Sequence, residues 1–183
     1  MLKKAVENGA RHALVSNIGH IDLAKEFGLQ VHGDFRLNVT NTQTVGVLES
    51  LGVEDVILSP ELTLPQLRDI RGNTAAIVYG RIPLMVLEKC IGKDIADCNT
   101  CNSGKMQLTD RRGVSFPVLR EQDHRSVIYN SIPTGMSDRV RELDRASIVN
   151  RHFIFSTETA RHVDAVINAY KNGDSLPTQV RRI

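Results

Sequence analysis

The sequence predicts an α/β fold whose strands form a parallel sheet. Six short apolar segments alternate with helical segments, and several of the helical segments are followed closely by a glycine. A strand, a helix and a second strand in this order form a right-handed crossover, which makes the two strands parallel. The predicted strands are residues 12–16, 29–37, 55–59, 75–79, 126–130 and 152–155.

The helices between these strands carry start and stop signals of their own. Gly28, Gly52 and Gly173 follow amphipathic segments, which is typical of helix C-termini. Thr63 begins one helix, and Gln66 stands three residues later, in the spacing of a capping box. The predicted helices are residues 2–8, 21–27, 40–51, 63–71, 137–148 and 157–170.

Six strands do not decide between the two common parallel architectures. A closed (β/α) barrel has eight strands, so six of them would form part of one. An open, doubly wound sheet would bind a nucleotide through a Gly-x-Gly-x-x-Gly fingerprint or a phosphate loop, and the sequence contains neither.

Residues 88–125 interrupt the alternation of strands and helices and contain all three cysteines. Cys90 precedes the pair Cys98 and Cys101, and His124 is the next strong metal-binding side chain. A Cys-x-x-Cys turn presents two sulfurs to one ion, and thiolates with an imidazole suit zinc or an iron-sulfur cluster. Three free thiols and an ordinary loop histidine are the alternative. Within the insertion, residues 105–109 and 114–118 read as a β-hairpin around a turn at 110–113.

Composition narrows the class of protein further. The 183 residues include 23 basic and 21 acidic side chains, a balance that favours neither a nucleic-acid coat nor a membrane-surface protein. No apolar run approaches the roughly 18 to 20 residues of a membrane helix, and the N-terminus lacks the apolar core of a signal peptide. We therefore expect a cytoplasmic protein with no membrane partner, built as one domain over residues 1–175 with a tail at 176–183.

Five motifs in order resemble the U-32 peptidase family, the collagenase-like proteases. They are GDFRLNVTN from Gly33, VILSPEL from Val56, VYGRIPLM from Val78, LTDRRGVSFPV from Leu108 and IYNS from Ile128. The resemblance implies a modified TIM-like (β/α) barrel, of which this chain would carry about six of the eight strands, with the Cys-containing β-hairpin as an insertion. It also implies that a partner supplies the rest, either a second copy in a homodimer or a missing N-terminal barrel segment.

The resemblance carries two kinds of chemistry. Members are classed as peptidases without an assigned mechanism, and others are similar to iron-sulfur proteins that assist hydroxylation of RNA or of the ubiquinone ring. In those relatives four cysteines hold the cluster. Cys90, Cys98 and Cys101 match three of them, and His124 stands at the fourth position. A set of three cysteines and one histidine is equally a zinc site.

Candidate site residues follow the predicted strands at their carboxyl ends, where barrel enzymes place their pockets. The set consists of Glu61, Arg81 and Asn130 as catalytic candidates and Asn17, Asp34 and Asn38 as substrate-binding candidates. Glu61 and Arg81 follow adjacent strands and could pair. Helix capping or structural ion pairing is the alternative for every member. His20 and His32 receive no role.

Two classes of function remain open from the sequence. The first is an enzyme acting on peptide or RNA, with zinc or an iron-sulfur cluster over the barrel mouth. The second is a non-catalytic module in which a zinc ion pins the insertion and the barrel mouth binds a peptide or RNA. The local signatures His-Glu-x-x-His and Gly-x-Ser-x-Gly are absent, which weakens proteolysis without excluding it.

Overall fold

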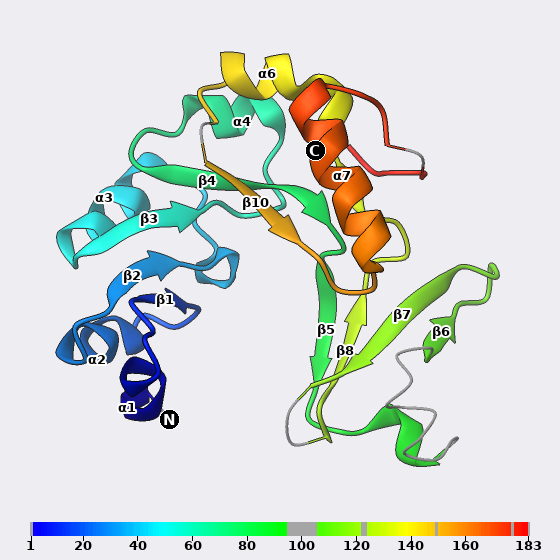
Figure 1. Ribbon diagram of the computed structural model, residues 1–183, viewed down its shortest axis with the longest axis horizontal. Coiled ribbons are helices and arrows are strands. Elements are labelled where there is room, and N and C mark those ends of the chain that lie inside the picture. Colours follow the sequence, from blue (N-terminus) through cyan, green and yellow to red (C-terminus); the bar gives the residue numbers. More distant parts are fainter. Residues whose placement is uncertain (1, 95–105, 122–123, 149, 177, 183) are drawn as a thin grey trace. The chain divides into compact units, whose positions relative to one another are not determined.

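The computed structural model describes residues 2–94, 106–121, 124–148, 150–176 and 178–182 (Figure 1). Backbone contacts divide the chain into two compact units. The first unit comprises residues 1–78 and 139–152, and the second comprises residues 79–138 and 153–182. The domain bounds expected from the sequence stay a prediction.

A curled parallel sheet gives the protein its mixed α/β fold. Its strand order is β1-β2-β3-β4-β10, and β1 to β4 pair in parallel (Figure 1). The strands are β1 (His12–Val15), β2 (Gln30–Gly33), β3 (Val53–Ile57), β4 (Thr74–Gly80) and β10 (Asn150–Ile154). β4 and β10 begin in the first unit and end in the second. In the second unit, β9 (Thr134–Gly135) pairs antiparallel with the end of β4.

Helices connect the strands of the first unit. They are α1 (Leu2–Glu7), α2 (His20–Glu26), α3 (Thr42–Ser50), α4 (Leu64–Asp69) and α6 (Val140–Arg145), with 3-10 turns η1 (Phe35–Leu37) and η4 (Ser137–Arg139), the latter beginning in the second unit. Asn41 caps α3, because its side-chain oxygen accepts a hydrogen bond from the Thr44 amide at 2.9 Å. The capping box predicted at α4 is confirmed, since Gln66 Oε1 accepts from the Thr63 amide at 2.8 Å. Four of these helices bury apolar side chains, among them Ile21 on α2, Val45 on α3, Leu67 on α4 and Leu143 on α6.

The second unit contains an antiparallel sheet of order β5-β8-β7-β6. Its strands are β5 (Pro83–Leu87), β6 (Gln107–Thr109), β7 (Ser115–Arg120) and β8 (Ser126–Tyr129), and η2 (Ile91–Asp94) and α7 (Ala160–Asn172) belong to the same unit. Met106, Val118 and Ile128 form a buried cluster on this sheet. The predicted hairpin is confirmed, because β6 and β7 pair antiparallel around a turn in which the Gly113 amide donates to the Asp110 carbonyl.

Three sequence predictions about elements are corrected by the structure. Residues 126–130 were expected in the parallel sheet, but β8 lies in the antiparallel sheet between β5 and β7. β5 was not predicted, and the strand expected at 29–37 ends at Gly33, where η1 follows. A short apolar run shows that a strand is buried, but it does not show which sheet the strand joins.

Candidate functional site

Three polar side chains form a continuous hydrogen-bonded chain across the first three strands of the parallel sheet. Asp55 on β3 lies opposite His32 on β2 in the strand register. The His32 Nδ1 atom is 2.7 Å from Asp55 Oδ1, and His32 Nε2 is 3.0 Å from Nδ1 of His12 on β1. The register places Leu14 opposite His32, so His12 reaches His32 along the diagonal of the ladder. We call His12, His32 and Asp55 the histidine chain.

The histidine chain runs from a half-buried end to an exposed end. The side chains of His32 and Asp55 are 28% and 25% exposed, whereas His12 is exposed. A structural ion pair in a protein core has both partners buried, whereas the histidine chain ends in an imidazole ring that faces solvent. The arrangement can therefore pass a proton between a carboxylate and an accessible imidazole.

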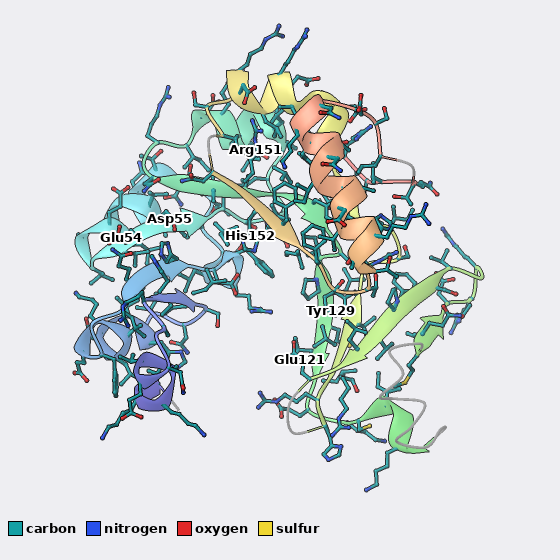
Figure 2. All side chains as sticks on the ribbon, viewed as in Figure 1. Glu54, Asp55, Glu121, Tyr129, Arg151 and His152 are labelled. Carbon is teal, nitrogen blue, oxygen red and sulfur yellow. The ribbon has the colours of Figure 1, made fainter. Side chains whose placement is uncertain are left out.

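A third histidine of the first unit, His152, lies close enough to Asp34 and Asp55 to interact with their charges. Burial lowers the pKa of His152 on β10, and the negative charges of Asp34 and then Asp55 act in the opposite direction. Figure 2 labels Asp55 on β3 and His152 on β10. Asp34 is itself only 3% exposed and accepts a hydrogen bond from Arg36 Nη1 at 2.8 Å. The face therefore combines three imidazoles with two carboxylates.

The substrate-binding candidates Asn17, Asp34 and Asn38 all stand in the connections that follow β1 and β2. Asn17 Oδ1 accepts from the Gly19 amide at 2.9 Å. Asn38 adopts a left-handed conformation at φ 53° and ends the 3-10 turn η1. Local backbone roles thus explain Asn17 and Asn38, while the buried Asp34 is the member with a charged partner. Their contact with a substrate stays a prediction.

The catalytic candidates Glu61, Arg81 and Asn130 are distributed over both units. In the second unit, Arg81 Nη1 donates to the backbone carbonyls of Asn130, at 2.8 Å, and Ser131, while Nε is 3.3 Å from Thr157 Oγ1. In the first unit, Glu61 is exposed. Pairing of Glu61 with Arg81 stays a prediction, because the two residues belong to separate units.

Tyr79 and Glu158 form a polar contact in the second unit that sequence reasoning missed. The Tyr79 hydroxyl is 3.2 Å from Glu158 Oε1, and Oε2 of the same carboxylate accepts from the amides of Ser156 and Thr157. Burial raises the pKa of Tyr79, and the neighbouring Glu158 charge adds to the effect. Glu158 thereby fixes the loop that presents Thr157 to Arg81.

The predicted metal ligands fall partly outside the described residues. Cys98 and Cys101 lie there, whereas Cys90 and His124 are described. Cys90 is a free thiol packed against the Met106 cluster, and His124 is exposed with φ at 63°. Within the described part of the chain, no three His, Cys, Asp or Glu side chains are placed to hold one ion.

The ladder between β5 and β8 brings the segments that carry Cys90 and His124 together. Leu87 pairs with Ser126, and the Ile91 amide donates to Ser126 Oγ at 3.2 Å. Glu88 and Arg125 form an ion pair at 3.0 Å across the same strand ends. Residues 88–91 and 124–126 therefore run beside each other, although they are more than thirty residues apart in sequence.

Comparison with known proteins identifies the family. The sequence model of Peptidase family U32 matches residues 1–171. The chain belongs to peptidase family U32. An uncharacterized protease of Methanocaldococcus jannaschii is 45% identical to this U32 chain over 60 residues. That match covers 33% of the U32 chain and 14% of the relative. No solved structure matches the U32 chain.

The family match confirms the resemblance read from the five motifs. Among the described residues of the U32 chain, no helix combines the length and hydropathy needed to cross a membrane. The sequence did not reveal the histidine chain, because its members are 20 and 23 residues apart and meet only through strand register. The available signal in the sequence was one histidine in each of two successive predicted strands, His12 in residues 12–16 and His32 in residues 29–37.

Proposed function

We propose that this U32 chain is the barrel portion of a peptidase that hydrolyses peptide bonds. The family match over residues 1–171 carries the proposal. The relative that matches over 60 residues is itself named a protease, which supports the same assignment. The polar face of the parallel sheet, with its imidazoles and carboxylates, supplies the acid and base groups that amide hydrolysis needs.

The parallel pairing of β1 to β4 supports a TIM-like barrel as the complete architecture. Parallel strands linked by helices close into such a barrel when eight are present. We propose that the remaining strands come from an N-terminal segment of the same polypeptide or from a second copy of the chain. β1 lies at one end of the strand order β1-β2-β3-β4-β10, the position at which a further strand would pair with this sheet.

We further propose that Cys90, Cys98, Cys101 and His124 hold a zinc ion or an iron-sulfur cluster. The adjacency of residues 88–91 and 124–126 supports this, because it brings the segments of two donors to one end of the β5–β8 ladder. Three sulfurs and one imidazole suit either group. Zinc would supply Lewis-acid or structural stabilisation, and a cluster would supply electron transfer.

Metal content tests the proposed centre. Protein purified without oxygen should contain stoichiometric metal, and C98S or C101S should each lose it because a hydroxyl is a much poorer ligand. N102S, at the position that follows Cys101 in the sequence, is the matched control and should keep the metal. H124C should shift the preference toward an iron-sulfur cluster. Unchanged metal in both cysteine variants removes the site.

Peptide cleavage tests the proposed activity. A library of internally quenched peptides should be cut by the purified chain, and an RNA of mixed sequence should be left intact. Visible absorption of an iron-sulfur cluster without peptide cleavage would instead favour the alternative, an iron-sulfur protein that assists hydroxylation of RNA or ubiquinone. Stoichiometric zinc with neither activity would favour a non-catalytic module that binds a peptide or RNA.

A further inference from the structure

The positions of the protons in the histidine chain follow from its geometry. A carboxylate only accepts hydrogen bonds, so His32 Nδ1 carries the proton that it donates to Asp55 at 2.7 Å. In a neutral imidazole the other nitrogen then accepts, so His32 Nε2 accepts from Nδ1 of His12 at 3.0 Å. His12 Nε2 is left with a free lone pair. The basic end of the chain is thus the ring that faces solvent.

We propose that His12 is the general base of a hydrolytic site on this face of the parallel sheet, with His32 and Asp55 as positioning residues. The assignment rests on the proposed peptidase function. It differs from the residues expected from the sequence, which gave His32 no role and did not include His12 or Asp55. A base oriented by a second group, which is oriented by a carboxylate, follows the logic of hydrolytic triads.

The reaction balances without any further reagent. His12 Nε2 takes a proton from water as the water oxygen bonds to the substrate carbonyl carbon. The carbon–nitrogen bond then breaks, and the amine leaves with the proton returned by the His12 imidazolium. While His12 is charged, its Nδ1 proton still points to His32, and the Asp55 carboxylate stabilises the positive charge through that ring.

The neighbouring groups indicate the kind of substrate. Leu14 lies two residues beyond His12 on the same side of β1, and the residue is 53% exposed. His152 and Asp34 are further titratable groups of this face, and Arg36 pairs with Asp34 at 2.8 Å. An extended peptide with an uncharged, apolar residue next to the cleaved bond fits this combination.

Two matched pairs of variants test the role of His12. The probes are p-nitrophenyl acetate and the quenched peptides. H12Q should reduce the rate about 100-fold or more, because a general base contributes about 10²–10⁴. H20Q changes an exposed histidine at the start of α2 and should stay within about twofold of the unaltered protein.

The second pair tests the positioning residues by separating kcat from KM. D55N should lower kcat for the quenched peptides and leave KM unchanged, because the carboxylate no longer holds the His32 ring that orients His12. D22N removes a carboxylate that is 87% exposed and lies outside the histidine chain, so neither kcat nor KM should change. Nitrogen-15 NMR of the unaltered protein should show His32 protonated at Nδ1.

The outcomes separate this proposal from the peptidase function. Peptide cleavage that survives in H12Q overturns the role of His12 and leaves the peptidase assignment standing. Ester hydrolysis that depends on His12 without any peptide cleavage leaves the base in place and overturns the peptidase assignment. Ester hydrolysis that H12Q leaves unchanged overturns the proposal. A spectrum of the unaltered protein in which His32 is protonated at Nε2 alone also overturns it, and that measurement does not depend on whether a variant folds.

Discussion

Gly80 is the glycine at which an added Cβ should lower the stability of the protein most. It is the last residue of β4, it has φ at 128°, and it directly precedes Arg81. A Cβ built there would lie 2.2 Å from the backbone oxygen of Ile154 and 2.7 Å from its Cβ. Backbone atoms of a paired segment cannot swing aside as a flexible side chain can. The G80A substitution must therefore displace β4 or β10.

The expected cost of G80A combines two effects. A non-glycine residue in a sparsely populated backbone region costs about 1–3 kcal/mol. Forcing a methyl group into a close-packed contact costs about 1–3 kcal/mol more. We expect a total of about 4 kcal/mol, which is a large share of the 5–15 kcal/mol that stabilises a typical domain.

Gly113 provides a matched control in the same unit. Its φ is 78°, but a Cβ there would meet nothing within 4 Å, so G113A carries only the backbone cost of about 1–2 kcal/mol. All three tyrosines, Tyr79, Tyr129 and Tyr170, lie in the second unit, and the chain has no tryptophan. Tyrosine fluorescence during urea unfolding therefore reports on this unit. Equal losses in G80A and G113A would refute the steric argument.

Three further predictions follow from single contacts. Because the pKa of Tyr79 is raised, the folded state keeps the phenolic proton at a pH where the unfolded state ionises. The free energy of unfolding should therefore fall above about pH 10, by up to about 1.4 kcal/mol per pH unit. Y79F should flatten that part of a series of urea-unfolding curves. Because burial lowers the pKa of His152, the unfolded state takes up the proton first, so stability should fall as pH drops below about 6.5, and H152Q should lessen this loss in the same series. Q66A should destabilise the protein by about 1 kcal/mol through loss of the capping box, whereas Q43A, an exposed change in α3, should cost less in thermal unfolding; equal effects would count against the cap.

Local features of this protein were readable from the sequence. The capping box at Thr63 and Gln66 involves groups three residues apart, and the structure contains it at 2.8 Å. The hairpin turn is also local, because Asp110 Oδ1 accepts from the amides of Arg112 and Val114. The alternation of strands and helices likewise predicted the parallel sheet. The capping box, the hairpin turn and the individual strands and helices each depend on neighbours within a few positions along the chain.

The partners of the site residues depended on tertiary structure. Arg81 binds carbonyls near residue 130, and the Tyr79 hydroxyl meets Glu158, 79 positions further along the chain. Residues 126–130 were predicted as a strand of the parallel sheet, but β8 pairs antiparallel with β5. None of these contacts leaves a local pattern, because the side chains involved are brought together by different strands and loops.

The sequence by itself determined the family, the α/β class and most element positions, because apolar periodicity and turn residues act over short distances. Only the tertiary structure decided that His12, His32 and Asp55 form one chain. Their contact depends on the register of three parallel strands, including a shift between Val31 and His32. Register is set by the burial of whole strand faces against their helices, so no single segment encodes it.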